Sequence, residues 1–244
     1  MVLELRRNIA LFACLAIGLL VACGSDNPTQ QVDDSTGIDP APAMSQAVEQ
    51  LLALESASFS LDHLEGSTML VPGVLMTKVY GEVSIPDRFS VTVEAESEFP
   101  KSYIEISIIT IEDTAYMTDI LSGRWNQISP DSLPFNLLGL GQTLADIVDV
   151  VQEPQVLGQE RLRGVDTLHI KGQIASEDLS ELVPGAGQGF PVKLELWLDR
   201  DQGLLQQVLI LGRVVPTDDE NTERELTLQD INQSVVISPP SDAG

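Results

Sequence analysis

Long stretches of this chain alternate apolar and polar residues with a period of two. Residues 89–95 read Phe-Ser-Val-Thr-Val-Glu-Ala, and the same alternation returns at 79–85, 104–108, 168–174 and 192–198. Successive side chains of a β-strand point to opposite faces, so the pattern predicts strands with one apolar and one polar face. Such strands are typical of an antiparallel sheet that is packed on one face and solvated on the other.

Helical spacing of apolar residues interrupts the strands in two places, at Met44–Leu54 and Leu133–Val151. Each segment predicts an amphipathic helix that packs its apolar side against the sheet. Ser176–Leu182 predicts a third, shorter helix that ends before Pro184. Helices between runs of strands indicate an α+β fold, with one large curved antiparallel β-sheet and a few helices on one face.

Three further segments complete the predicted sheet. Residues 192–210 predict a hairpin around the turn Asp-Arg-Asp-Gln-Gly at 199–203, and residues 225–236 predict the last strand element. Residues 68–77 (TMLVPGVLMT) predict a loop that is too apolar for a solvated turn. This loop either lines the mouth of a cavity or caps the core.

The N-terminus has the pattern of an export signal. Arg6 and Arg7 precede an apolar run from Ile9 to Ala22, which is shorter than the roughly 20 residues that a membrane-spanning helix needs. Leu20-Val21-Ala22-Cys23 resembles the lipobox of bacterial lipoproteins. This resemblance implies removal of residues 1–22 and acylation of Cys23 by diacylglyceryl, with palmitate-type chains. An ordinary signal peptide with a stray cysteine is the alternative.

Residues 24–42 are polar, contain Pro and Gly, and show no periodicity. They predict a flexible tether between the acylated Cys23 and a single domain at 43–240, with residues 241–244 as a disordered tail. A coil of this length spans about 25 Å on average. We therefore expect an exported protein, lipid-anchored at Cys23 to the outer face of the cytoplasmic membrane in the cell envelope.

The formal net charge of −24 disfavours a basic patch for nucleic acid, so no nucleic-acid partner is expected. His63 and His169, the two histidines, fall in predicted strands. The sequence has no Gly-x-Ser-x-Gly, HExxH, CxxC or Walker pattern. Asp218-Asp219-Glu220 predicts a solvated hairpin tip. We expect no enzyme, and no catalytic residue, metal site or cofactor.

The order of these elements resembles the LppX/LprG (LppX-LprAFG) lipoprotein family. The segments that carry the resemblance are Val71–Val74 followed by Lys78–Val83, Ile111–Met117 with Trp125, Gly158–Gly172, and Val192–Leu198 with its hairpin. The resemblance implies a half-barrel whose concave apolar face is covered by helices. It also implies a cavity that binds acyl chains of lipids or glycolipids, which the protein carries across the cell envelope. A membrane transporter is a further candidate partner.

We expect the cavity between the inner sheet face and the helix around Leu137–Val151. Its candidate ligand-binding residues are Phe59, Leu61, Leu70, Val71, Val74, Leu75, Val91, Leu137, Leu138, Leu144, Ile147, Val148 and Val151. One alternative is a half-barrel module similar to LolA, LolB or RseB, which binds acylated protein or acts as an envelope sensor. The other is a structural envelope protein whose sheet is filled by its own side chains.

Overall fold

The computed structural model describes residues 37–133, 137–183 and 185–241. The predictions for the signal peptide, for Cys23, for the tether up to residue 36 and for residues 242–244 of the tail lie outside the described residues.

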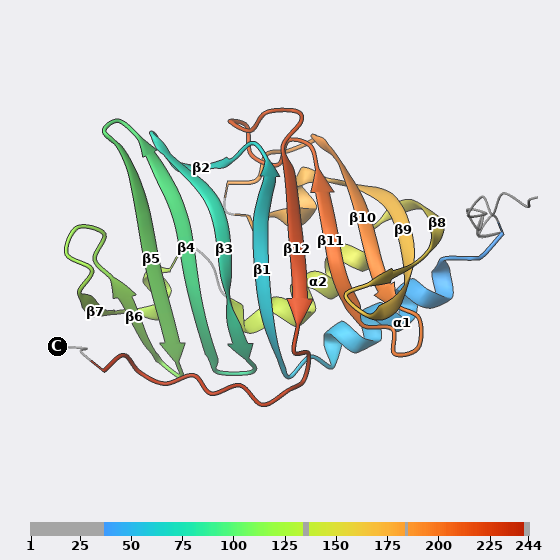
Figure 1. Ribbon diagram of the computed structural model, residues 1–244, viewed down its shortest axis with the longest axis horizontal. Helices are drawn as coiled ribbons and strands as arrows, with labels where there is room; N and C mark the ends of the chain where they lie inside the picture. Colours follow the sequence, from blue (N-terminus) through green and yellow to red (C-terminus); the bar gives the residue numbers. More distant parts are fainter. Residues whose placement is uncertain (1–36, 134–136, 184, 242–244) are drawn as a thin grey trace, which may run out of the picture. The chain divides into compact units, whose positions relative to one another are not determined.

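The described residues form one antiparallel sheet of twelve strands, and eleven of them follow the order β7-β6-β5-β4-β3-β1-β12-β11-β10-β9-β8 (Figure 1). β2 pairs with β3 outside this order. The strands are β1 Ser56–Glu65, β2 Thr68–Val71, β3 Val74–Ser84, β4 Arg88–Glu98, β5 Lys101–Ile111, β6 Thr114–Thr118, β7 Trp125–Ile128, β8 Gln152–Leu162, β9 Val165–Ala175, β10 Pro191–Asp199, β11 Leu205–Leu211 and β12 Glu223–Gln229.

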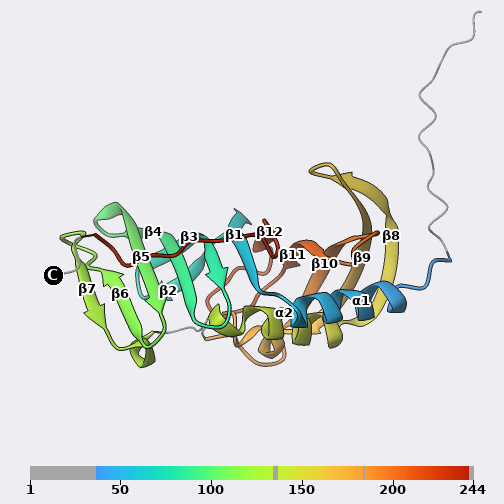
Figure 2. The same cartoon turned by 90° about the horizontal axis from the view of Figure 1, so that it is seen from below.

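The helices lie against one face of this sheet, which we call the inner face. The helical elements are α1 Ala41–Leu52, α2 Leu140–Asp149, and the 3₁₀ helices η1 Pro130–Ser132, η2 Leu137–Gly139 and η3 Ser176–Leu179. Figure 2 shows α1 and α2 beneath β1 and the C-terminal strands. The predicted α+β half-barrel is therefore confirmed. No helix of the described ranges is long and apolar enough to cross a membrane.

The sheet consists of two halves joined at a central seam between β1 and β12. β1 and β3–β7 make the N-terminal half, and β8–β12 make the C-terminal half. At the seam Phe59 lies opposite Leu228 and Leu61 opposite Leu226. Directly opposite residues share a face, so both pairs place apolar side chains on the inner face.

Helix α1 begins earlier than predicted, at Ala41, so the tether prediction to residue 42 was too long. Pro40 is the N-cap and Pro42 lies in the first turn, where a missing backbone N–H does not break the helix. Asp39 accepts the N–H of Ala41 at 3.0 Å. The prolines therefore open the helix and do not delay it.

Three other elements also differ from their predicted type or limits, because of local backbone structure. The predicted loop at 68–77 is the β2–β3 hairpin, whose turn at Pro72-Gly73 uses φ +80° at the glycine. The predicted third helix shrinks to η3. The last strand ends at Gln229, because Asp230 and Asn232 adopt positive φ and the side chain of Asn232 accepts the N–H of Glu55 at 2.8 Å.

The two α-helices approach each other closely at Gly141. A Cβ atom at this position would lie 2.4 Å from the carbonyl oxygen of Leu51. Glycine therefore allows α2 to reach its place beside α1 on the inner face.

A buried ion pair joins β12, β2 and the β11–β12 loop on the inner face. Arg224 is 1% exposed and donates to the carboxylate of Asp218, which is 3% exposed. The guanidinium also donates to the Thr68 hydroxyl at 2.7 and 3.1 Å, and Asp218 accepts the N–H groups of Val214 and Val215. The prediction of a solvated tip was thus wrong for Asp218, because its carboxylate neutralises a buried cation.

We expect Arg224→Met to lower the free energy of unfolding by ~3–5 kcal/mol, because it leaves a buried carboxylate without its cation. Urea unfolding followed by circular dichroism measures the change. Arg88→Met is the matched control, since Arg88 and Asp87 are each 41% exposed and such pairs contribute only ~0–1 kcal/mol. Equal losses in the two variants would contradict the assignment.

His63 belongs to the same cluster and lies opposite Arg224 across the seam. The Thr68 hydroxyl accepts from Arg224, so it donates its proton to Nε2 of His63 at 2.9 Å, while Nδ1–H donates to the Thr77 carbonyl at 3.0 Å. These bonds describe a neutral imidazole. Burial lowers the pKa of His63 below its usual 6.5, and the Arg224 charge adds to this effect.

Because the folded-state pKa of His63 is lowered, the unfolded chain binds this proton more readily. The stability that the neutral imidazole contributes is present above about pH 6.5 and is lost as the pH falls toward the folded-state pKa. We expect His63→Gln to show a smaller loss of unfolding free energy than the wild type between about pH 7.5 and about pH 5.5. Identical pH slopes for the two proteins would contradict a buried neutral His63.

Candidate functional site

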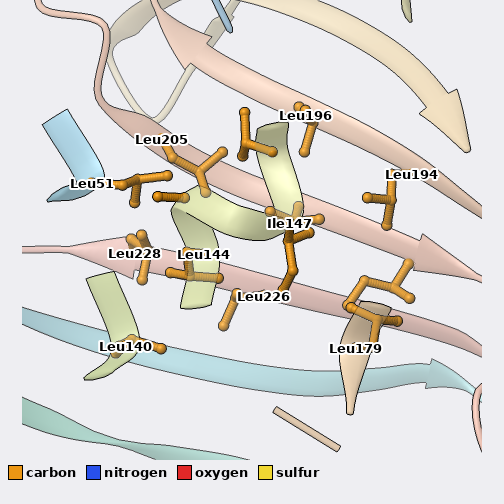
Figure 3. Packing of buried hydrophobic residues seen from close by; sticks show 14 of the residues in the cluster. Leu51, Leu140, Leu144, Ile147, Leu179, Leu194, Leu196, Leu205, Leu226 and Leu228 are labelled. Atoms are coloured by element: carbon orange, nitrogen blue, oxygen red, sulfur yellow. The ribbon is translucent and has the colours of Figure 1, made fainter. Parts of the chain in front are cut away.

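The inner face of the C-terminal half is a packed core. Leu144 and Ile147 of α2 point into a cluster with Leu194, Leu196 and Leu226 of the strands (Figure 3). The void among these side chains measures about 10 Å³, less than a single acyl chain requires. Among the described residues, the space between α2 and the sheet is thus filled. The cavity predicted there stays a prediction that requires α2 to move.

Most of the predicted ligand-binding residues belong to this core or lie against it. The buried ones are Phe59, Val91, Leu144, Ile147, Val148 and Val151. Leu61, Leu137 and Leu138 are half-buried and pack against the same cluster. The structure therefore brings these nine residues together, around side chains that contact one another.

The remaining four predicted residues lie apart from α2, in the β2–β3 hairpin. Leu70 is 42% and Val71 56% exposed, whereas Val74 and Leu75 are half-buried. This hairpin extends beyond the upper end of β3, next to the β4–β5 turn (Figure 1). The N–H of Glu98 donates to the carbonyl of Gly73 at 2.9 Å and connects the two turns.

The inner face of the N-terminal half has a different character. Register places Leu61 opposite Val79, Val79 opposite Val93, and Val93 opposite Ile106, so all four share the inner face. The next pairs on this face are Ala95 with Ile104 and Ile108 with Met117. We call the set Leu61, Val79, Val93, Ile104, Ile106 and Met117 the inner strip.

The inner strip is only partly covered. Val93 is 6% exposed, but the other five side chains are half-buried. The two α-helices lie beneath β1 and the C-terminal strands (Figure 2), and the short η2 contacts β3 and β4 of this half. Apolar side chains that remain only partly covered along several adjacent strands are typical of a surface for an apolar ligand or partner.

The polar side chains beside the inner strip carry no net charge as a group. His63 follows Leu61 on the same face of β1 and is held neutral, and Arg224 is paired with Asp218. The strip itself is entirely apolar. The described residues contain no group of three or more His, Cys, Asp or Glu side chains that could hold a metal. The strip therefore offers an apolar surface that suits hydrocarbon, and both ring nitrogens of the neighbouring His63 are already hydrogen-bonded.

A polar hollow of about 380 Å³ lies on the other face of the C-terminal half. Lys171, Lys193 and Glu195 are among its lining residues, and they alternate with the buried residues of β9 and β10. Charges of both signs suit a hydrated ligand and not a hydrocarbon chain.

Five residues of the inner strip were missing from the predicted ligand-binding set: Val79, Val93, Ile104, Ile106 and Met117. All but Met117 fall in stretches whose alternation predicts an inward apolar side. The alternation gives the face of a residue, but it does not show how far the helices extend across that face.

Comparison with known proteins supports the fold. A family model described as "LppX_LprAFG lipoprotein" matches residues 39–237. The lipoarabinomannan carrier protein LprG of Mycobacterium tuberculosis (strain ATCC 25618 / H37Rv) is 20% identical over 239 residues, covering 96% of this chain and 95% of LprG.

Two solved structures are similar at 18% identity. LprF from Mycobacterium bovis has a TM-score of 0.63 and covers 84% of this chain and 99% of LprF. The lipoprotein LppX from Mycobacterium tuberculosis has a TM-score of 0.56 and covers 82% of this chain and 100% of LppX. At this identity the likeness concerns the fold alone.

We expect Val148→Trp to destabilise the protein by ~1–3 kcal/mol, because the side chain is 1% exposed in a filled core. Thermal unfolding should show a lower Tm, whereas Asp149→Trp on the exposed side of α2 should leave Tm nearly unchanged. A Val148→Trp protein with the wild-type Tm that no longer takes up lipid would instead indicate an open cavity beneath α2.

Proposed function

Because the chain belongs to the LppX_LprAFG lipoprotein family, we propose that it is a membrane-anchored lipid carrier. It binds the acyl chains of a lipid or glycolipid on the inner strip and carries them across the cell envelope. The name of LprG, a lipoarabinomannan carrier, supports a lipid or glycolipid ligand. Both the LprG name and the family description refer to carriers or lipoproteins, and we assign no catalytic role.

The partly covered inner strip is the observation that carries this proposal. Its side chains come from five neighbouring strands and continue into the core through Val91 and Ile108. An acyl chain laid along them would remove apolar surface from water on both partners, which contributes ~0.8 kcal/mol for each buried CH₂ group.

The ligand in this proposal lies on the N-terminal half. A lipid with several chains needs a pocket near ~1,000 Å³, and the void beneath α2 is about 10 Å³. Leu137 and Leu138 belong to η2, which contacts β3 and β4 beside the strip. We therefore keep Leu61, Leu137 and Leu138 in the proposed binding site, together with the other five residues of the strip.

The proposed anchor is an acyl group on Cys23 after removal of residues 1–22. It would hold the exported domain at the outer face of the cytoplasmic membrane. Two or three acyl chains give stable anchoring where one chain is marginal. A membrane transporter remains a candidate partner for loading.

The first test is native mass spectrometry of the Cys23→Ala protein with its signal replaced, purified from membrane-containing extracts. We expect co-purifying lipid. Bare protein that also fails to take up added lipid would contradict the proposal. Acylated polypeptide in place of free lipid would favour a half-barrel module similar to LolA, LolB or RseB.

The second test locates the ligand with two variants of one strand. Ile106 is on the inner face and Ile109 on the outer face of β5, and both are half-buried. We expect Ile106→Glu to lower bound lipid at least about tenfold, equal to ~1.4 kcal/mol, because a carboxylate would contact hydrocarbon. Ile109→Glu should bind like the wild type. Equal lipid loss in both variants would remove the inner strip from the site.

A further inference from the structure

Exposed apolar side chains gather at three turns of the N-terminal half. Phe99 in the β4–β5 turn and Leu121 in the β6–β7 turn are each 96% exposed. Ile120 is 57%, Val71 56% and Leu70 42% exposed. We call Leu70, Val71 and Phe99, which share one end of the sheet, the turn edge.

The strand register places two of these turns at the same end of the sheet. Val74 at the start of β3 lies opposite Ser97 near the end of β4, so the β2–β3 and β4–β5 turns are neighbours. β6 is shorter and ends with Thr118 beside Ser107, near the middle of β5, so the β6–β7 turn lies lower along this edge of the sheet. Figure 1 shows the β2–β3 and β4–β5 turns side by side.

Local hydrogen bonds fix the turns. The Glu98 N–H to Gly73 carbonyl bond joins the first two, and the hydroxyls of Ser97 and Ser102 lie 2.7 Å apart across the second. In the third, the Asp119 carboxylate accepts the N–H of Leu121 at 3.1 Å and of Ser122 at 2.8 Å. The apolar side chains are therefore held in projecting positions.

We propose that the turn edge inserts into the surface of a lipid bilayer, and that lipid passes there between the bilayer and the inner strip. This inference rests on the proposed lipid-carrier function and adds the place where the carrier meets its membrane. Apolar side chains that project singly from separate turns offer no flat or concave surface to a folded protein, but each can enter the acyl boundary.

An aromatic residue behind the turn edge favours the same partner. Tyr103, 59% exposed, follows the β4–β5 turn. Tyrosine and tryptophan are enriched at the membrane–water interface, where an apolar ring carries a polar end. Tyr103 lies just behind Phe99, at that depth.

The turn edge is continuous with the inner strip. On the inner face, the hydroxyl pair Ser97 with Ser102 comes first behind the turn, and the pairs Ala95 with Ile104 and Val93 with Ile106 follow. An acyl chain that leaves the bilayer at the turns therefore meets apolar side chains along the strands.

Charge indicates which bilayer surface the edge prefers. Glu96, Glu98, Glu105 and Asp119 lie close to the turns, against the two cations Lys101 and Arg124. With a formal net charge of −24 for the chain, anionic headgroups repel the edge, whereas neutral headgroups do not. We expect tighter binding to phosphatidylcholine vesicles than to vesicles that contain phosphatidylglycerol.

The test is vesicle flotation of the full chain carrying Cys23→Ala, so that the anchor takes no part. We expect Phe99→Ser and Val71→Ser each to weaken binding to phosphatidylcholine vesicles about tenfold. Their exposed fractions of 96% and 56% predict an unchanged Tm. The matched controls are Leu52→Ser and Val236→Ser, at positions 54% and 83% exposed outside the turn edge, and they should bind as the wild type does.

A monomeric fluorescent fatty acid, used below its critical micelle concentration, separates docking from lipid binding. The turn-edge variants should bind it like the wild type while losing vesicle binding and lipid uptake from vesicles. The inference is overturned if the wild type does not bind vesicles, or if turn-edge and control variants bind them equally. Fatty-acid binding would still support the carrier function in that case. Vesicle binding without fatty-acid binding would support the edge and refute the carrier function on which lipid passage rests.

Discussion

Two short helices cannot cover the inner face of so wide a sheet. Ten spacings between eleven strands make a sheet about 48 Å across at ~4.8 Å each. The described α-helices have 12 and 10 residues, which gives lengths of ~18 and ~15 Å. They pack side by side on the C-terminal half and complete a core there. The helices leave the side chains of the inner strip only partly covered, so the strip follows from the small size of the helices relative to the sheet.

The seam between β1 and β12 separates the closed core of the C-terminal half from the partly covered inner strip of the N-terminal half. On one side, Leu226 and Leu228 belong to the closed core, and on the other Leu61 begins the partly open strip. The pair of Arg224 and Asp218 lies on this boundary and holds β2 through Thr68. A buried ion pair is weak evidence for added stability, but its directional bonds fix one arrangement of the elements that meet there. The ion pair therefore fixes β2 and β12 beside the partly covered inner strip.

Much of the fold could be predicted because strand alternation is local. Residues 89–95 show their inner and outer faces without any knowledge of their neighbours. Asp218 could not be placed in this way, because its burial depends on Arg224 facing inward and on Thr68 from the far end of the sequence. The same limit applied to the site. Leu144 and Val148 have the spacing of an apolar helix face, and this spacing is the same for core and cavity. Ile106 was predicted to point inward, but its partial exposure depends on how far the helices extend across the inner face.

The seam also sets an order of assembly. β1, β3, β4 and β5 form a series of short-range pairings, and β8–β11 form another, whereas β1 and β12 come from opposite ends of the described sequence. Loop-closure entropy makes such a distant pairing slow relative to its neighbours. Until residues 223–229 have been synthesised, one edge of β1 has no strand beside it, and an open edge of this kind can pair with another chain. Pairing of β12, the last strand in the sequence, with β1 therefore also protects the protein against aggregation.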